Sequence, residues 1–280
     1  TVTDEITIAQ AYAINSYTEG QVKLVSIIDS AANLLTLASV DNSEMTITEA
    51  KITIVDAPTL AELKAINDAI SGTITLHDYT VALNGSSADV AAALAGSFAD
   101  AYTGNITLND ASGTSIAAED ITIIAGATNG TVTVSNNIAL TGTSAQIAAA
   151  VADVDTFSGT PTATLSDAHT LAELKAINNA LTGTLTLNDV TVALSGSSAD
   201  VAAALAGTFA AGYTGTATVN DNHSLAELVA INNGTSGNIT LNSNAVALTG
   251  STSDVKAALA GNVGAAYTGN IVLNDANGTG

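Results

Sequence analysis

Cysteine and tryptophan are absent from this 280-residue chain, proline occurs twice, and aromatic residues make up only 3%. Without cysteine the chain can form no disulfide bonds and offers no thiolate ligands to metals. Its apolar fraction of 47% therefore comes almost wholly from alanine, valine, isoleucine and leucine. Side chains of this size predict a thin, layered core.

Basic residues are also scarce. Five are present, all of them lysine, against 26 acidic residues, and the formal net charge is -21. Such a chain is repelled by phosphate backbones and by anionic lipids, so we expect no nucleic-acid partner and no association with a membrane surface. Divalent cations or high salt are its natural counter-charge.

Signals for export or membrane insertion are missing as well. The chain has no run of about 18 apolar residues and no basic start followed by an apolar stretch, so we expect neither a membrane span nor a signal peptide within it. It begins at Thr1 instead of methionine. We interpret it as a processed or truncated piece of a larger protein.

Catalytic motifs are not found. The patterns G-x-S-x-G, H-E-x-x-H and G-x-x-x-x-G-K do not occur, and the many carboxylates have no basic partner beside them. The three histidines, His77, His169 and His223, share no metal-ligand spacing, and we interpret them as exposed loop residues. The sequence predicts no catalytic residue and no enzyme.

The main feature of the sequence is an internal repeat. Residues 57–110 align without gaps to residues 168–221 and match at 40 of 54 positions. Such self-similarity at a fixed period is typical of repeat architectures. The chain divides into copies 1 to 5 and the start of a sixth: residues 1–56 (diverged), 57–110, 111–167 (diverged), 168–221, 222–275 and 276–280.

Four of the five copies contain a strong helix-start signal. Thr170 and Glu173 form the S/T-x-x-E capping box, in which each side chain bonds the backbone of the other residue. Leu171 and Leu174 begin an apolar helical stripe, and Gly183 is expected to end this helix. The same box recurs, with Gln in the first copy, at Thr7/Gln10, Thr59/Glu62 and Ser224/Glu227.

A second helix follows in each copy. Ser197 and Asp200 take its cap and third positions, whereas in copy 5 the cap is either Thr252 or Ser251. Alternating runs such as TLTLND and TATVND, which predict half-buried strands, separate the helices. Each 54-residue copy therefore reads as two half-repeats of about 27 residues, each with one helix and strand material.

These elements predict an α/β repeat solenoid. A single half-repeat cannot bury its apolar face, so neighbouring half-repeats must stack. Strands joined through helices run parallel. We expect an elongated molecule with a parallel sheet along one side and short, Ala-rich helices along the other. The alternative, a string of separate 54-residue beads, is disfavoured because no linker separates the copies.

Aspartates that end strands are the candidate ligand residues. In a stack of repeats, equivalent carboxylates would form rows that suit Ca²⁺, the one cofactor considered. The alternative is that each Asp caps or charges the N-terminus of the helix that follows it. The candidate metal ligands are Asp56, Asp110, Asp167, Asp189, Asp221 and Asp275.

Threonines alternate along several predicted strands, as in Thr184/Thr186 and Thr216/Thr218. An outward threonine array is one way in which a solenoid can match an ice lattice. The ordinary explanation is that a β-branched side chain suits the solvent face of a strand. We keep ice binding as a minor alternative.

The segments VTDEITIAQAYAIN, DSAANLL, TLAELKAIN and VALSGSSADVAAALAG resemble repeats of very large bacterial, notably cyanobacterial, cell-surface proteins of the secreted adhesin and haemolysin-like class. The resemblance covers essentially the whole chain. It implies an extracellular, secreted or cell-surface location and a role in surface layers, adhesion or motility. Many relatives of this class carry calcium-binding nonapeptides, which this chain lacks.

The sequence thus predicts an acidic structural module of an extracellular filament or surface layer (S-layer), with copies of itself as partner. The alternative is the stalk or binding region of a secreted adhesin, with a cell surface or glycans as partner. A calcium-stabilised motility protein and an ice-binding protein are further alternatives. A polysaccharide-acting enzyme would need an acidic pair that breaks the repeat.

Overall fold

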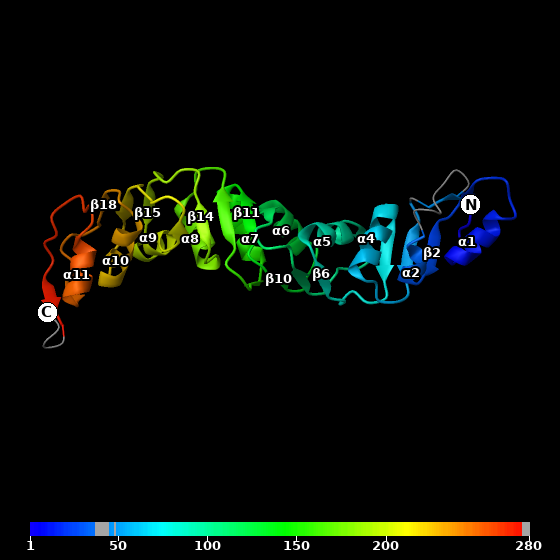
Figure 1. Cartoon of the computed structure of the whole chain (residues 1–280), viewed down its shortest axis with the longest axis horizontal. Helices are drawn as coiled ribbons and strands as arrows, with labels where there is room; N and C mark the ends of the chain where they lie inside the picture. Colours follow the sequence, from blue (N-terminus) through cyan, green and yellow to red (C-terminus); the bar gives the residue numbers. More distant parts are fainter. Residues whose placement is uncertain (37–44, 48, 276–280) are drawn as a thin grey trace. The chain divides into compact units, whose positions relative to one another are not determined.

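The computed structural model describes residues 1–36, 45–47 and 49–275. The fold is α/β, as predicted: helices and parallel strands alternate along the chain (Figure 1). The chain divides into two compact units. The first is Thr1–Ala111, Asp120–Asn136 and Asp153–Ser158, and the second is Ser112–Glu119, Asn137–Ala152 and Gly159–Gly280. The division therefore runs through copy 3, and the sixth-copy start at 276–280 lies outside the described residues.

In the first unit, short parallel strands form separate sheets. The helices are α1 (Ile8–Asn15), α2 (Ala31–Leu34), α4 (Leu60–Ala69), α5 (Ser87–Leu94) and most of α6 (Ala118–Gly126). The sheets are β1 (Val22–Lys23) with β3 (Met45–Thr46); β2 (Ser26–Asp29), β4 (Lys51–Ile54), β5 (Thr73–Leu76) and β7 (Ser97–Phe98); and β6 (Leu83–Gly85), β8 (Ile106–Leu108), β10 (Val132–Val134) and β12 (Thr156–Phe157).

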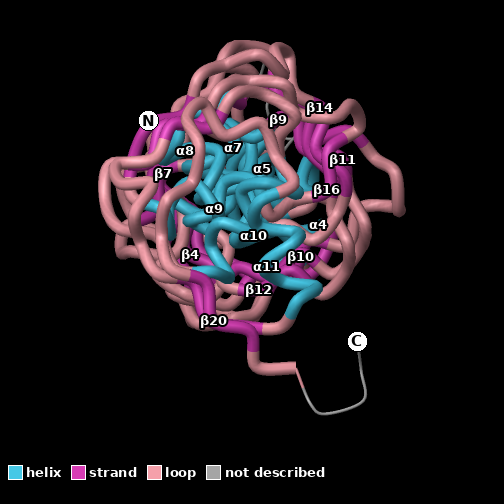
Figure 2. The backbone as a smooth tube through the Cα atoms, turned by 90° about the vertical axis from the view of Figure 1, so that its left-hand side faces the viewer, coloured by secondary structure: helices cyan, strands magenta, loops and turns pink. Residues whose placement is uncertain are grey.

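The second unit is built in the same way. Its helices are α7 (Ser144–Asp153), α8 (Leu171–Ala180), α9 (Ser198–Leu205), α10 (Leu225–Gly234) and α11 (Thr252–Leu259). Its sheets are β9 (Ser115–Ala117), β11 (Ala139–Gly142), β13 (Thr162–Leu165), β14 (Thr184–Thr186) and β16 (Thr208–Phe209); β15 (Leu194–Gly196), β17 (Ala217–Val219) and β18 (Ile239–Thr240); and β19 (Leu248–Gly250) with β20 (Ile271–Leu273). Figure 2 shows β9, β11, β14 and β16 of the first of these sheets together.

Helix starts follow the sequence closely. The capping boxes predicted at Thr7, Thr59, Thr170 and Ser224 are all present, with reciprocal bonds between side chain and backbone. The cap of the last helix, left open between two residues, is Ser251, whose hydroxyl accepts the backbone N–H of Asp254 at 3.1 Å. Local chemistry is sufficient here because a capping box joins residues only three apart.

The core consists of aliphatic side chains from helices and strands. Helices α4 and α5 pack together in the first unit, as do α8 with α9 and α10 with α11 in the second. Ile52 and Ile74, which pair across β4 and β5, are fully buried, as are Leu63 and Ile66 of α4. The threonines between the buried strand residues face outward, which confirms the alternation predicted for these strands.

The arrangement of the strands in sheets differs from the prediction. Each half-repeat holds two strands: β14 and β15 lie between α8 and α9, and β16 and β17 between α9 and α10. Paired residues are separated by 22 positions in Ile52↔Ile74 and by 26 in Ile106↔Val132, whereas α8, α9 and α10 start 27 residues apart. The repeat length of 54 residues is not a multiple of the separation between paired residues. Equivalent strands of successive copies therefore lie in different sheets, as β14 and β18 do. The single sheet expected along one side is therefore replaced by several.

Gly183 does not end its helix. Helix α8 stops at Ala180, and Leu181 takes an extended conformation. A Cβ atom on Gly183 would lie 2.2 Å from the carbonyl oxygen of Pro161, on the neighbouring chain segment. Glycine is needed here because the backbones of two chain segments approach closely. The sequence rules for helix ends consider one segment at a time and do not reveal such a contact.

No helix within the described residues has the length and apolar character required to cross a bilayer.

Candidate functional site

The strand-end aspartates are the most regular polar feature of the molecule. Each of five accepts a hydrogen bond from the backbone N–H of the first residue of a helix. The pairs are Asp56 with Ala31 (2.7 Å), Asp110 with Ser87 (2.9 Å), Asp167 with Ser144 (2.7 Å), Asp221 with Ser198 (2.7 Å) and Asp275 with Thr252 (3.0 Å). We call these five contacts the aspartate clamps.

The aspartate clamps correct one sequence interpretation. In the alternative to a calcium row, each Asp would cap the helix that follows it, but it binds an earlier helix, whose first residue lies 23 positions before the Asp, or 25 positions for Asp56. The N–H groups of a first helical turn have no partner within the helix, and the turn carries partial positive charge. The carboxylate satisfies one such N–H group and holds the next chain segment against the helix. Asp29 makes the same contact with Ile8 at 3.1 Å, which the sequence analysis missed.

Asp189 belongs to a different structure. Its carboxylate accepts the backbone N–H of Thr191 at 2.8 Å and the hydroxyl of the same residue at 2.6 Å. These bonds, the hydroxyl first, lower the pKa of Asp189. Asp78 binds Thr80 in the same manner. The sequence grouped Asp189 with the clamps because both follow strands, yet it stabilises a local turn.

No three acidic or histidine side chains come together as a possible metal site within the described residues. Each clamp carboxylate is already used as an acceptor for a helix N–H, as described above. Calcium binding by Asp56, Asp110, Asp167, Asp189, Asp221 and Asp275 therefore stays a prediction from sequence alone.

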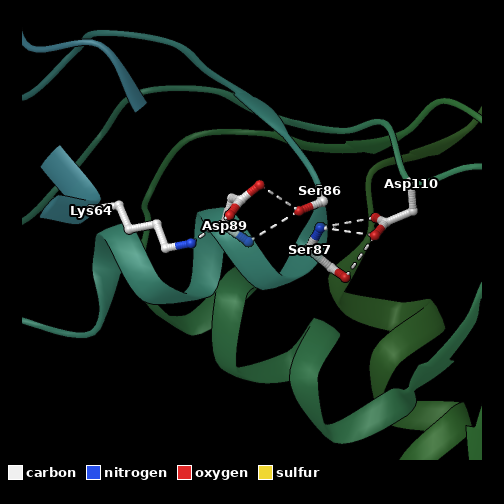
Figure 3. A network of polar contacts seen from close by, with 5 residues as sticks. All are labelled: Lys64, Ser86, Ser87, Asp89 and Asp110. Atoms are coloured by element: carbon white, nitrogen blue, oxygen red, sulfur yellow. Dashed lines mark hydrogen bonds and ion pairs between the residues drawn. The ribbon is translucent and has the colours of Figure 1, made fainter. Parts of the chain in front are cut away.

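A larger polar network surrounds the start of α5 (Figure 3). Asp110 is 8% exposed, and it accepts the hydroxyl of Ser87 at 3.0 Å as well as the backbone N–H. On the neighbouring helix α4, Lys64 reaches Asp89 of α5 at 2.7 Å. This bond is the main cause of the lowered pKa of Asp89. Because both ends of the ion pair are well exposed, it adds little to stability, whereas the buried clamp is the stronger element.

Near its C-terminal end, helix α5 accepts a hydrogen bond from an asparagine side chain of α4. Asn67 of α4 donates its side-chain amide to the carbonyl oxygen of Ala92 in α5 at 2.8 Å. A Cβ atom on Gly96 would lie 1.8 Å from the oxygen of that asparagine, so only glycine leaves room for it. Asn178 with Ala204 and Asn232 with Ala257 repeat the bond in α8/α9 and α10/α11. The recurring AIN and AG segments were the available signal, but nothing in the sequence showed that they meet.

Two of the three histidines are buried, contrary to the prediction. His169 and His223 are each 3% exposed, and only His77 lies on the surface. His169 Nε2 lies 3.0 Å from the hydroxyl of Tyr213, which itself donates to the carbonyl oxygen of Val192 at 2.7 Å. The tyrosine proton is thus already committed, so Nε2 carries the proton that His169 donates, and Nδ1 is left buried without a partner.

Burial lowers the pKa of His169 and of His223. Nearby carboxylates, Asp189 and Glu173 for His169, oppose this effect but do not overcome it. His223 repeats the arrangement with Tyr267, again at 3.0 Å. Copy 2 has Pro58 at the equivalent position, and Tyr102 there binds the carbonyl oxygen of Val81 without a histidine. Sequence reasoning missed these pairs because the two rings are 44 residues apart.

The remaining surface features are shallow. A groove of about 270 Å³ lies between α4 and α5, lined by Leu60, Ala61, Lys64, Ala65, Asp68 and Asp89, and α10 and α11 form a related groove. Outward threonines pair in short rows, such as Thr107, Thr133 and Thr156 across β8, β10 and β12. Neither feature brings a nucleophile and a base together in the part of the chain that the structure describes.

The comparisons with known proteins give no relative: no protein-family model, no curated protein and no solved structure matches this chain.

Proposed function

We propose that this chain is a structural repeat module of an extracellular bacterial filament or surface layer. In this proposal the 54-residue copies form one continuous solenoid, whose ends associate with the ends of further copies of the chain. The supporting observation is that every pair of consecutive copies is joined by the same kind of parallel strand pairing.

The pairing links the last strand of one copy to the first strand after the first helix of the next copy. It occurs in β4 with β5, β8 with β10, β13 with β14, and β17 with β18. The aspartate clamps recur in copies 1 to 5, and the asparagine bonds recur in copies 2, 4 and 5. A chain whose polar contacts mostly join one segment to the next is suited to building length.

Composition and resemblance support the location. The net charge of -21 favours solubility and disfavours nucleic acids and anionic membranes as partners. The likeness of the repeats to those of secreted bacterial surface proteins supports an extracellular or cell-surface role, without catalysis. The adhesin stalk is the alternative: it requires the same solenoid but a separate binding region for glycans or a cell surface.

Sedimentation velocity and negative-stain microscopy of the purified 280-residue chain test this proposal. Over a rising concentration series, the filament role predicts particles that lengthen in steps of one chain without thickening. Calcium and a chelator should be compared in parallel, because a calcium-stabilised protein would lengthen only with the ion. Short particles of constant length under every condition would favour the stalk and contradict the filament.

A further inference from the structure

The sheet of β9, β11, β13, β14 and β16 presents a regular outer surface, and all of it belongs to the second unit. Leu140, Ala163 and Leu185 in three of its strands are at most 1% exposed, so the residues on either side of them point outward. Figure 2 shows four of these strands together. The outward strand residues are Ser115, Ala117, Ala139, Thr141, Thr162, Thr164, Thr184, Thr186 and Thr208. We call this surface the threonine face.

The threonines of this face form two rows that cross the strands. The first row is Thr141, Thr164 and Thr186, and the second row is Thr162, Thr184 and Thr208. Neighbouring strands lie about 4.8 Å apart and residues two apart on one strand lie about 6.6 Å apart, so the hydroxyls repeat in two directions. Other sheets lack this regularity. Ile28 and Lys51 are among the outward residues of β2 and β4, and β17 with β18 carries one short row.

The threonine face carries no charged side chain, although the formal net charge of the chain is -21. Among its threonine hydroxyls, only that of Thr141 forms a hydrogen bond with a described residue, donating to the carbonyl oxygen of Ile116 at 3.3 Å. In the first unit, by contrast, the hydroxyl of Thr53 donates to Glu5 at 2.7 Å. The hydroxyls of the face are therefore free to bond a partner outside the chain, and an uncharged partner suits them.

The array of hydroxyls is rigid before it meets a partner. β11, β13 and β14 each pair with a strand on both sides, which fixes their backbones. Threonine is branched at Cβ and has few χ1 rotamers, so its hydroxyl is held in place better than the polar group of a longer side chain. Little conformational entropy is lost when such a surface binds, which favours a partner that is itself regular and extended.

We propose that the threonine face binds ice. In tetrahedrally bonded water, oxygens about 2.75 Å apart place second neighbours about 4.5 Å apart, close to the strand spacing of about 4.8 Å. When the lattice is centred on a row of three threonines, the mismatch at either end is only about 0.3 Å, which lies within the normal spread of O–H···O distances. A charged side chain would impose its own hydration shell on the lattice, and the face has none. This inference goes beyond the proposed function and does not depend on it.

The ice affinity of the whole 280-residue chain tests the inference. Ice is grown slowly from a dilute buffer that contains the purified chain, and the protein concentration is then measured in the ice and in the remaining liquid. The chain should be enriched in the ice, whereas serum albumin, added as a reference, should be rejected into the liquid. The same sample should slow the coarsening of small ice crystals held just below the melting point.

A pair of double variants locates the binding surface. Thr164→Lys with Thr186→Lys puts two charges at the centre of the face and should abolish enrichment in the ice. Thr218→Lys with Thr240→Lys is the matched control, because these two residues form the equivalent pair at the next junction between copies but lie off the face. The control should be enriched as strongly as the parent chain. Thr184→Lys probes the second row and should reduce enrichment, and thermal melts check that each variant is folded.

The outcomes are distinct from those of the filament test. Enrichment of the parent chain and of the control, with loss in the variant at Thr164 and Thr186, would establish the threonine face as the ice-binding surface. A parent chain that is rejected from ice as completely as albumin would overturn the inference, as would equal enrichment of both double variants. If the variant at Thr164 and Thr186 alters only sedimentation, the face joins copies of the chain and the inference is wrong. The filament test measures particle length above freezing and is decided separately.

Discussion

Copies 2 and 4 are identical at 40 of 54 positions, and a comparison of the copies shows which polar contacts are kept and which vary. The aspartate clamp and the capping box have the same backbone partners in both copies, and the asparagine bond is kept with its acceptor moved by one residue. At the residue before the box, copy 2 has Pro58 and copy 4 has the buried His169. Copy 5 keeps a histidine, His223, but replaces the lysine of the ion pair with Val229. Contacts at helix ends are thus kept, while ion pairs and ring contacts vary.

The largest expected effect concerns a copy taken out of its context. A peptide of residues 168–221 loses the strands on both sides, since β14 pairs with β13 of copy 3 and β17 pairs with β18 of copy 5. We expect no cooperative unfolding transition, because a single repeat cannot bury its apolar face. Circular dichroism during heating checks this, with the full chain as control. A sharp transition in the monomeric peptide would contradict a continuous core.

The clamps give the next effect. Asp110→Ala should lower the free energy of unfolding by about 2 kcal/mol, because it leaves buried N–H and hydroxyl groups of Ser87 without an acceptor. Asp275→Ala should cost less than about 1 kcal/mol, because that clamp is exposed. Urea unfolding of both variants gives the comparison. Equal losses would show that burial does not set the strength of a clamp.

The buried histidines of copies 4 and 5, His169 and His223, should make the stability of the second unit decrease in acid. Because the pKa of His169 and of His223 is lowered in the folded state, the unfolded state takes up protons first. Their contribution to stability is full above about pH 6.5 and is lost as the pH falls through the folded pKa. Carboxylates with lowered pKa, such as Glu173, add to this only below about pH 4.5.

The variant H169P/H223P puts the residue of copy 2 into copies 4 and 5. Its melting temperature should fall less between pH 7 and pH 5 than that of the parent chain. Measurement of the melting temperature at each pH unit gives the slope. If the two slopes agree, the buried histidines do not couple folding to protonation.

The smallest effect is expected at the ion pair. Lys64→Val copies the residue of copy 5 and should change the free energy of unfolding by no more than about 0.5 kcal/mol, because the pair is exposed. Val229→Lys offers the reverse exchange, opposite Asp254. A loss of several kcal/mol for Lys64→Val in urea unfolding would place the ion pair among the contacts that build the fold.

Features within a few residues of one another could be predicted from the sequence. The capping boxes at Thr59 and Thr170, the alternation in the strands and the parallel α/β class all follow from local chemistry and the repeat. The pairing of strands could not be predicted, because an offset of 22 to 26 residues is hidden behind periods of 27 and 54. His169 was misplaced because the ring that covers it, Tyr213, comes from a distant part of the chain.

The candidate site followed the same rule. The aspartates were singled out correctly as recurrent residues, but their partner helix was not, since the chain must first turn back before Asp110 meets Ser87. The pairing of Asn67 with Gly96 was also hidden, because no local rule links a helix asparagine to a glycine 29 positions later. The residue types indicated which side chains form recurrent polar contacts, but their bonding partners were visible only in the three-dimensional structure.

The direction of the aspartate clamps bears on how the chain assembles as it emerges N-terminus first. The start of α9 receives its carboxylate only after a further 23 residues, up to Asp221, have been delivered. The first turn of each clamped helix therefore lacks a hydrogen-bond acceptor until the following segment supplies the aspartate carboxylate. Folding should therefore proceed from the N-terminus towards the C-terminus, and each helix start should be completed only when roughly half a further copy has been synthesised.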